Sequence, residues 1–371
     1  MKKLKVMTIF GTRPEAIKMI PVVKELEKYL ERIQSVVVVT GQHRQMLDQI
    51  LTTFKVYPDY DLDIMQPNQT LVDVTKKVLE GLTLVLESEQ PDIILVHGDT
   101  TTAFASALAA YYQKIKVGHV EAGLRTWNKY SPFPEEMNRQ LVDSLTDIYF
   151  APTELSKENL LVENHPEEKI YVTGNTAIDN LKYTIDERYT NNVLKKMKDN
   201  HRMILLTMHR RENLGKPMEE IFQTMKELVQ AFEDIEIVFP VHKNPKVQII
   251  AGKYLSNVPR IHLIEPLDVH DFQNMAAKSY LILTDSGGIQ EEAPSLGKPV
   301  LVLRDTTERP EGVAAGTLKL VGTSKATVYK EVKDLLENQE LYTKMANAKN
   351  PYGDGDSSQR IVQALLDEFG Y

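Results

Sequence analysis

The chain has 371 residues, of which 42 % are hydrophobic and 26 % are charged, a composition typical of a globular protein long enough for two domains. Its formal net charge of −8 argues against a nucleic-acid-binding protein, because phosphate backbones favour a basic surface. The absence of cysteine excludes disulfides, thiolate metal sites and a cysteine nucleophile, and it suits the reducing cytoplasm where we expect the protein.

The beginning of the chain predicts neither a signal peptide nor a membrane anchor. Lys2, Lys3 and Lys5 precede an apolar run, but that run ends at Gly11 and Arg13. No other stretch reaches membrane-spanning length, so we expect no membrane insertion.

Apolar, β-rich runs alternate with longer amphipathic runs along the whole chain. In the first half the predicted strands are 6–10, 35–40, 92–96, 117–120, 148–150 and 170–172, and the predicted helices are 15–30, 71–87, 101–112, 136–145 and 153–163. A second series of predicted strands follows at 203–206, 235–239, 261–264, 280–283, 299–303 and 318–321. Nearly continuous apolar strands separated by helices predict parallel sheets that are covered on both faces.

Two such series predict an α/β protein with two doubly wound, Rossmann-like domains facing a central cleft. We expect residues 1–175 to form the N-terminal domain, with a C-terminal helix in 356–371 packing back onto it. Residues 176–355 are expected to form the second domain. Open α/β sheets bind ligands outside the carboxyl ends of their strands, so the cleft is the default site.

The first predicted strand leads into a helix whose start carries two cations. Arg13 and Lys18 flank Pro14, which occupies a favourable first helical position. Cations at the positive end of a helix dipole are unfavourable unless an anion binds there. Two solvated surface cations are the alternative. The second strand ends in a polar loop, Thr40 to Gln45, that suits hydrogen bonding.

Three carboxylates follow later strands of the first half. Asp99 comes after the third strand, and Glu121 comes directly after the fourth, where burial of an acid is costly without a partner or a function. Glu135 lies in the first turn of the next helix, and Arg139 follows one turn later. Asp99 as a helix cap and a Glu135–Arg139 ion pair are the structural alternatives. All three acids could converge on one pocket.

The second half places histidines and cations after its strands. His209 and His242 each follow a predicted strand beside cations, which suits a phosphate pocket. Phe272 could stack on a base or pack in the core. Arg309 precedes a helix-starting proline and is another candidate anion contact.

A strand, a tight polar turn and a helix start follow one another between Ile282 and Leu296. Ser286, Gly287 and Gly288 open this helix, where bare backbone N–H groups and the helix dipole favour a phosphate. Glu291 and Glu292 follow within about one turn and could accept hydrogen bonds from vicinal hydroxyls. The order suggests the diphosphate and ribose of a nucleotide, with an ordinary turn and an N-cap serine as the alternative.

Eight segments in order resemble one family, the non-hydrolysing UDP-N-acetylglucosamine 2-epimerases. They are Gly11-Thr-Arg-Pro-Glu-Ala-Ile-Lys18, His97-Gly-Asp-Thr100, His119-Val-Glu-Ala-Gly-Leu-Arg125, Pro134-Glu-Glu-Met-Asn-Arg139, Thr173-Gly-Asn-Thr176, His209-Arg-Arg-Glu-Asn213, Asp285 to Pro294 and Thr307-Glu-Arg-Pro310. The resemblance implies a fold like that of the GT-B glycosyltransferases and interconversion of UDP-GlcNAc and UDP-ManNAc. It also implies a homodimer, no redox cofactor and no metal.

The family reaction removes the C2 proton as UDP leaves C1, and the resulting glycal is protonated on its opposite face as UDP returns. The resemblance implies that Asp99, Glu121 and Glu135, with His209, form the catalytic set. It implies substrate binding by Arg13, Lys18, Arg139, Arg210, His242, Leu267, Phe272, Ser286, Gly287, Gly288, Glu292 and Arg309. Ser286 to Gly288 would cradle phosphate, Glu292 would take the ribose hydroxyls, and Leu267, Phe272 and Arg309 would flank the uridine.

Bacterial members of the family also bind a second UDP-GlcNAc as an activator. The matching regulatory positions are Gln42, His43 and Gln45, together with His242. Asn68 departs from the pattern, because some relatives carry arginine there. The product is expected to supply ManNAc for a cell-surface polysaccharide. A GT-B glycosyltransferase and a hydrolysing epimerase that releases ManNAc and UDP are the competing hypotheses.

Overall fold

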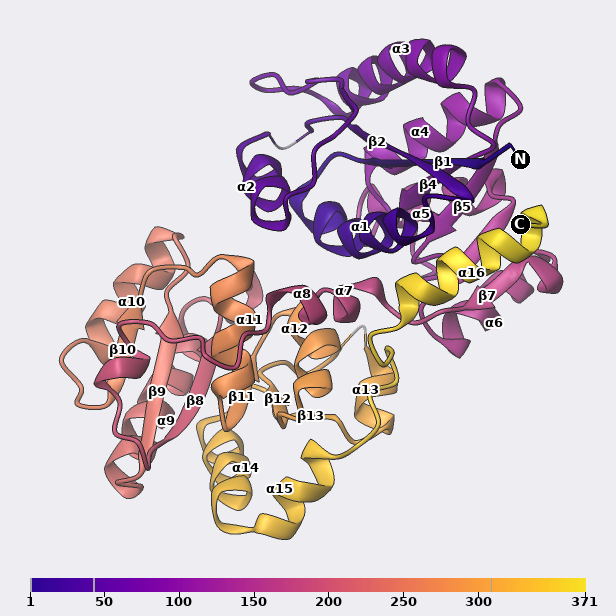
Figure 1. Ribbon diagram of the computed structural model, residues 1–371. Helices are drawn as coiled ribbons and strands as arrows, with labels where there is room; N and C mark the ends of the chain where they lie inside the picture. The colour runs from indigo at the N-terminus through magenta and orange to yellow at the C-terminus, as the bar shows by residue number, and fades with distance from the viewer. Residues whose placement is uncertain (1, 43, 308) are drawn as a thin grey trace. The chain divides into compact units, whose positions relative to one another are not determined.

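The computed structural model describes residues 2–42, 44–307 and 309–371, except for the side chains of residues 45 and 46. It divides into two compact units (Figure 1). Unit 1 contains Met1–Tyr183 and Tyr352–Tyr371, and unit 2 contains Thr184–Pro351. The division falls at 183/184 and 351/352, whereas the sequence analysis places it at 175/176 and 355/356. Along the described chain, no helix is both long and apolar enough to cross a membrane.

Unit 1 is built on a parallel sheet with the strand order β3-β2-β1-β4-β5-β6-β7. Its strands are β1 (Leu4–Phe10), β2 (Ile33–Val39), β3 (Tyr60–Asp61), β4 (Ile93–His97), β5 (Lys116–Val120), β6 (Ile148–Ala151) and β7 (Ile170–Val172). The chain runs outward from β1 to β3 and then crosses back to place β4 on the other side of β1. The sheet therefore has its topological switch point between the carboxyl ends of β1 and β4.

Helices cover both faces of this sheet. They are α1 (Arg13–Leu26), η1 (Glu27–Tyr29), α2 (Arg44–Phe54), α3 (Leu71–Glu89), α4 (Thr101–Tyr112), α5 (Glu135–Leu145), α6 (Glu154–Val162), η2 (Glu167–Lys169), α7 (Thr176–Asp179), α8 (Leu181–Thr184) and α16 (Ser357–Phe369). Met7 and Ile9 point to one face, where they cluster with Leu82 of α3, Ala107 of α4 and Val142 of α5. Helices α1 and α16 pack together elsewhere in the unit. Burial on both faces explains why the strands are almost wholly apolar.

Unit 2 repeats this plan with the strand order β10-β9-β8-β11-β12-β13, also parallel. The strands are β8 (Arg202–Thr207), β9 (Ile235–Pro240), β10 (Ile261–Ile264), β11 (Leu281–Thr284), β12 (Val300–Val302) and β13 (Leu318–Leu320). The helices are η3 (Leu194–Lys196), η4 (Arg211–Asn213), α9 (Lys216–Ala231), α10 (Pro245–Leu255), α11 (Val269–Lys278), α12 (Gly287–Glu292), η5 (Ala293–Leu296), α13 (Pro310–Ala314), α14 (Lys325–Glu337) and α15 (Gln339–Ala346). Here the switch point lies between β8 and β11.

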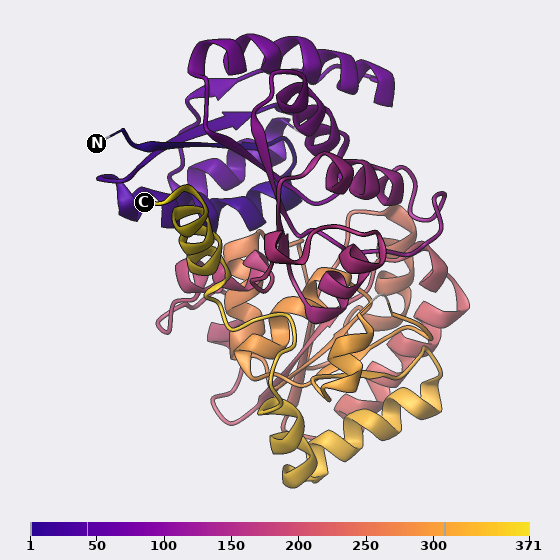
Figure 2. The same cartoon turned by 90° about the vertical axis from the view of Figure 1, so that its right-hand side faces the viewer.

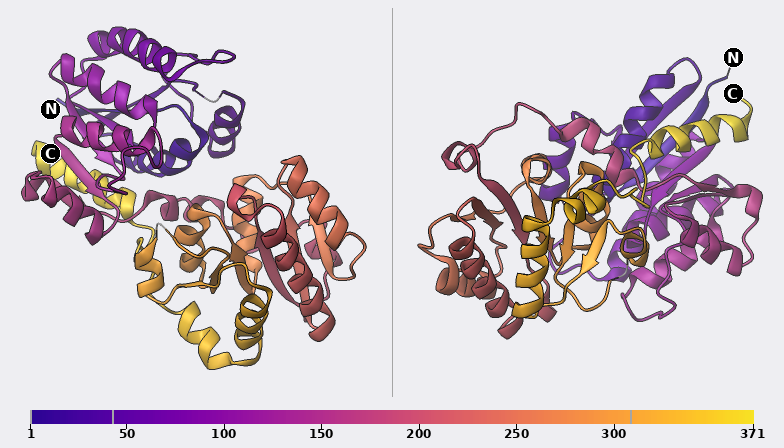
Figure 3. Two further views of the ribbon diagram at one scale, coloured as in Figure 1. Left: turned by 180° about the vertical axis from the view of Figure 1, so that it is seen from behind. Right: turned by 90° about the horizontal axis from the view of Figure 1, so that it is seen from below.

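The last helix, α16, returns to unit 1, so both ends of the chain belong to that unit (Figures 1 and 2). It packs against α1 and α7, and Figure 3 shows it lying along unit 1 in both views. The Asp179 carboxylate at the end of α7 accepts hydrogen bonds from the backbone N–H groups of Ser357 (3.1 Å) and Ser358 (2.5 Å). An acceptor at the start of α16 satisfies N–H groups that the helix itself cannot pair.

Candidate active site

The start of α1 lies at the switch point of unit 1 and is organised by a buried carboxylate. Glu15 accepts hydrogen bonds from the backbone N–H groups of Gly11 (3.1 Å) and Thr12 (2.8 Å), and Thr12 caps the helix. It also accepts a 2.6 Å hydrogen bond from Oγ1 of Thr100, which follows β4. Burial raises the pKa of Glu15, although these hydrogen bonds oppose the shift. Glu15 therefore holds the β1–α1 and β4–α4 turns together.

Glu121 lies directly after β5 with a φ of +68°, a conformation that is uncommon and strained for a residue with a side chain. Its Oε2 forms an ion pair with Lys18 of α1 and lies 3.6 Å from Nε2 of His97 and 3.4 Å from Nδ2 of Asn175. Burial alone would raise the pKa of Glu121, but Lys18 and His97 outweigh it and hold that pKa well below its ordinary value. Glu121 is thus a buried, ionised carboxylate beside the switch point.

Asp99 follows β4 and bonds to α5 on the neighbouring side. Its carboxylate forms an ion pair with Arg139, and its backbone carbonyl accepts a 2.9 Å hydrogen bond from Nδ2 of Asn138. Thr100, rather than Asp99, caps α4, because its Oγ1 accepts from the N–H of Ala103. Asp99 is therefore not the helix cap that was one reading of the sequence.

Glu135 and Glu136 begin α5 and have different surroundings. The Oε2 atom of Glu135 is buried and has no hydrogen-bond partner among the described residues. Glu136 is fully buried and accepts hydrogen bonds from the N–H groups of Thr126 and Trp127, both at 3.0 Å, and contacts Arg139 at 3.4 Å. Arg139 thus pairs with Asp99 and Glu136, and the Glu135–Arg139 ion pair considered from the sequence is not among the ion pairs of the described residues.

The remaining sequence-predicted residues of unit 1 lie near the same turns. Arg13 is the first residue of α1, partly buried, and no hydrogen bond or ion pair joins it to another described residue. Oε1 of Gln42 accepts a 2.8 Å hydrogen bond from Oγ1 of Thr102 in α4. His43 and the side chain of Gln45, two of the predicted regulatory positions, lie outside the described part of the chain.

Asp285 organises the switch point of unit 2. This fully buried residue follows β11, and its Oδ2 accepts hydrogen bonds from the N–H groups of His209 and Arg210, both at 2.9 Å, and from Nδ2 of Asn213 at 3.1 Å. Its Oδ1 lies 3.3 Å from Nδ1 of His209, and its backbone carbonyl accepts from Nε of Arg210. Asp285 thus fixes the loop that carries His209 and Arg210.

His209 stacks on His242, which follows β9, with ring centroids 5.4 Å apart and an interplanar angle of 15°. Burial lowers the pKa of His209, and His242 and Arg210 lower it further, while Asp285 opposes the shift. The neutral imidazole is therefore favoured, and it can donate or accept a hydrogen bond.

The start of α12 is covered by a guanidinium. Ser286 precedes this short helix as its N-cap residue, without a side-chain cap hydrogen bond. Arg309 lies over Gly287 so closely that a Cβ built on Gly287 would be 3.0 Å from Cζ of Arg309, whereas Gly288 is exposed. Arg309 also pairs with Glu291, with Nη2 2.7 Å from Oε1. The predicted phosphate cradle therefore has a cation beside it.

Three residues that were predicted to contact the nucleotide have partners within unit 2. Oε2 of Glu292 accepts a 2.8 Å hydrogen bond from Nε2 of Gln273. Leu267 and Phe272 are partly buried and pack against a core cluster that includes Val238 and Met275. For Phe272 this is the packing role that was one of the two readings of the sequence.

Sequence reasoning missed several residues that shape these turns. His119 was quoted only within a motif, yet it is fully buried, with Nδ1 2.6 Å from Asp143 and Nε2 2.8 Å from the carbonyl of Gly98. Arg125 pairs with the same Asp143 at 2.6 Å. Burial would raise the pKa of Asp143, but His119 and Arg125 together lower it. This network supports the turn that carries Glu121. The sequence signal that could have found this network is a histidine, His119, within an apolar strand together with a carboxylate, Asp143, on the apolar face of a helix.

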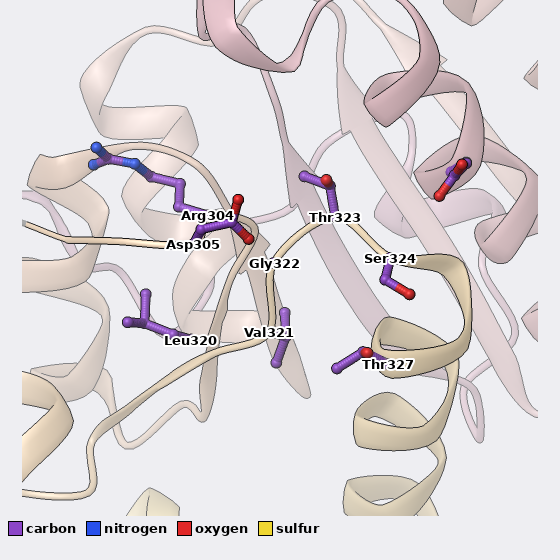
Figure 4. Close-up of a pocket in the computed structure, with 9 residues that line it drawn as sticks. Arg304, Asp305, Leu320, Val321, Gly322, Thr323, Ser324 and Thr327 are labelled. Carbon is purple, nitrogen blue, oxygen red and sulfur yellow. The ribbon is translucent and has the colours of Figure 1, made fainter.

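A surface pocket of about 550 Å³ in unit 2 does not coincide with the switch point (Figure 4). Its walls are the loops after β12 and β13, and it is lined by Glu220, Arg304, Asp305, Leu320, Val321, Gly322, Thr323, Ser324 and Thr327. The guanidinium of Arg304 points away from Thr323 and Ser324 (Figure 4). Across the part of the chain that the structure describes, no group of three or more His, Cys, Asp or Glu residues is placed to hold a metal ion.

Comparisons with known proteins identify the family of this chain. Residues 24–366 match the family model described as UDP-N-acetylglucosamine 2-epimerase. The UDP-N-acetylglucosamine 2-epimerase of Bacillus subtilis (strain 168) is 60 % identical over 371 residues, covering 100 % of this chain and 97 % of its own. The crystal structure of UDP-GlcNAc 2-epimerase from Neisseria meningitidis bound to UDP-GlcNAc is 53 % identical, with a TM-score of 0.85, covering 98 % of this chain and 100 % of its own.

A more distant likeness concerns the fold alone. The crystal structure of the glycotransferase of kitacinnamycin is 10 % identical and covers 99 % of this chain and 100 % of its own, with a TM-score of 0.69. Two parallel-sheet α/β units of the GT-B kind are thus common to both. Because the family model covers residues 24–366 and a relative is 60 % identical along the whole chain, the chain belongs to the UDP-N-acetylglucosamine 2-epimerase family and is an isomerase.

Proposed function

We propose that this protein interconverts UDP-GlcNAc and UDP-ManNAc by eliminating UDP and adding it back. The C2 proton of the sugar is not acidic, because no carbonyl is adjacent to it. Its removal becomes feasible when the C–H electron pair forms the C1–C2 double bond of a glycal and the C1–O pair leaves with UDP. Return of UDP with protonation of the opposite face of C2 inverts that centre. The reaction needs a base, an acid and anion stabilisation.

The acids of unit 1 supply the proton chemistry in this proposal. Asp99 and Glu121 follow the neighbouring strands β4 and β5, and Asn138 and Arg139 bring the first turns of α5, which begins with Glu135, against Asp99. This grouping of three carboxylates with Lys18 and Arg139 is the observation that carries the proposal. It fits a reaction with separate proton donor and acceptor groups better than it fits a simple binding site.

Residues of unit 2 hold the UDP moiety in this proposal. Arg210, Arg309 and the Ser286–Gly288 turn offer cations and backbone N–H groups to a diphosphate. His209 stabilises the charge that develops as UDP leaves, and Glu292 accepts from the ribose hydroxyls. The relative from Neisseria meningitidis, solved with UDP-GlcNAc bound, supports the choice of substrate.

The test is turnover of UDP-GlcNAc alone in D₂O, followed by NMR. We expect UDP-ManNAc that retains its diphosphate linkage and carries deuterium at C2, because the proton lost from C2 exchanges with solvent. Product without deuterium would contradict deprotonation at C2. Free ManNAc and UDP as the early products would instead identify a hydrolysing epimerase, and a requirement for an acceptor would identify a glycosyltransferase. We propose in addition that the UDP-ManNAc formed supplies ManNAc for a cell-surface polysaccharide.

A further inference from the structure

His97 is a buried histidine that the proposed mechanism leaves without a role. It is the last residue of β4, and its side chain is 6 % exposed. Its Nε2 is buried without a hydrogen-bond partner among the described residues and lies 3.6 Å from Oε2 of Glu121. Buried polar atoms are almost always hydrogen-bonded, so an orphaned nitrogen beside a carboxylate points to a function.

The contacts of Glu121 are divided unequally between its two oxygens. Oε2 receives Lys18, His97 and Asn175, from α1, β4 and the start of α7. Oε1 has no hydrogen bond to any described residue. A Cβ built on Gly98 would lie 3.6 Å from Oε1, so the glycine keeps this side of the carboxylate clear, directly before Asp99 in the chain. One oxygen is anchored, and the other remains available.

We propose that His97 is a positioning residue for the reaction proposed above, which fixes Oε2 of Glu121 with Lys18 and leaves Oε1 to exchange the proton with the sugar. In the direction in which Glu121 acts as base, Oε1 takes the C2 proton while the C–H pair forms the glycal double bond and the C1–O pair leaves with UDP. In the other direction, the same oxygen returns the proton to the glycal.

The charges around this carboxylate give the arrangement a pH signature. Lys18 and Glu15 face the cluster from α1, and His97 faces it from β4, while Asp99 is paired with Arg139. Lys18 and His97 lower the pKa of Glu121. Without His97 that pKa moves up toward its ordinary value. Glu121 then becomes protonated at a higher pH, and the acid limb of the kcat profile shifts to higher pH.

Two variants of His97 distinguish the orientation of the Glu121 carboxylate by an N–H donor from the effect of the histidine charge. His97→Gln keeps an uncharged N–H donor near the Nε2 position, whereas the shorter His97→Asn loses it. We expect kcat to fall about tenfold in His97→Gln and about 100-fold in His97→Asn, that is, no further than the lower end of the 10²–10⁴-fold effect of removing an acid–base group itself. KM should stay within about twofold, and the acid limb should move to higher pH in both variants.

His262→Gln is the matched control, because His262 pairs with Glu236 at 2.6 Å in unit 2, away from Glu121. It should leave the acid limb unchanged. The inference is overturned if both His97 variants lose activity equally at all pH values with the acid limb in place, or if neither folds, since His97 would then be only a core residue. A wild-type protein that incorporates no deuterium at C2 would instead defeat the proposed function.

Discussion

At the scale of single residues, Glu135 and Glu136 are neighbours of the same chemistry with different expected roles. Glu135→Gln should lower kcat by about 10²–10⁴-fold, because it removes a proposed acid–base group. The free energy of unfolding of this variant should change little, because Oε2 of Glu135 has no hydrogen-bond partner among the described residues. Steady-state kinetics on UDP-GlcNAc and urea unfolding of the same preparation measure both quantities.

Glu136→Gln is the matched variant and should show the opposite balance. The Glu136 carboxylate accepts from the N–H groups of Thr126 and Trp127 and lies beside Arg139. Replacement of one oxygen by an NH₂ group leaves a donor facing donors, so the free energy of unfolding should fall by about 1–3 kcal/mol. Equal losses of kcat in the two variants, with equal stability, would show that Glu135 has no special role.

Residue identities were easier to predict than residue partners. Polar residues that follow apolar strands, such as Asp99 and Glu121, can be found from the sequence because the carboxyl ends of parallel strands bind ligands. The sequence offered only Glu135 as an ion-pair partner of Arg139, because local spacing favours it. The observed partner Asp99 follows from the packing of α5 beside β4, which the sequence does not reveal. The structural role of Asp285 was also missed, because the N–H groups that it binds belong to His209 and Arg210, which are distant from it in the sequence.

At the scale of elements, the turn after β5 must pass close to α6. Gly123 has a φ of +84°, and a Cβ there would overlap the carbonyl oxygen of Ser156 and lie 2.9 Å from Cγ of Leu160. Gly123→Ala should therefore lower the free energy of unfolding by several kcal/mol, beyond the roughly 1–2 kcal/mol of a left-handed conformation alone. It should also reduce activity, because the same turn carries Glu121.

Gly215→Ala measures the part of the stability loss that comes from backbone conformation alone. Gly215 has a nearly equal φ of +86°, but a Cβ there would meet no atom within 4 Å. Its ψ of −132° lies outside the left-handed helical region, so the cost of Gly215→Ala should be the backbone strain alone, about 1–3 kcal/mol. Urea unfolding of both variants tests this comparison, and equal losses of stability would mean that the approach of α6 does not constrain the turn.

The main elements followed from hydrophobic patterning, with differences at their ends. Continuous apolar runs predicted β7 and β10 with the observed bounds, and the helix 101–112 is α4. The two-residue strand β3 (Tyr60–Asp61) was missed, because an edge strand of this length has no detectable period. The sequence analysis predicted two doubly wound parallel sheets but no strand order, so the positions of the two switch points are known only from the structure.

At the scale of the whole molecule, the two ends of the chain belong to one unit. Leu365 of α16 is fully buried in unit 1, where this helix packs against α1 and α7, whereas Gln363 is exposed. Leu365→Ala should lower the stability of unit 1 by about 2–5 kcal/mol, because it leaves a cavity in that core. Gln363→Ala should change it by less than about 0.5 kcal/mol.

Hydrogen exchange read by mass spectrometry locates this loss within the chain. In Leu365→Ala, peptides from α1 and α7 should exchange faster, because local stability sets the rate at which their amides open. Peptides from α9 and β9 of unit 2 should keep their wild-type rates, since the core around Phe222 and Phe239 contains no residue of α16. Faster exchange in both units would show that they unfold as one cooperative body. Unchanged exchange in α1 would show that the C-terminal helix does not stabilise the unit to which it returns.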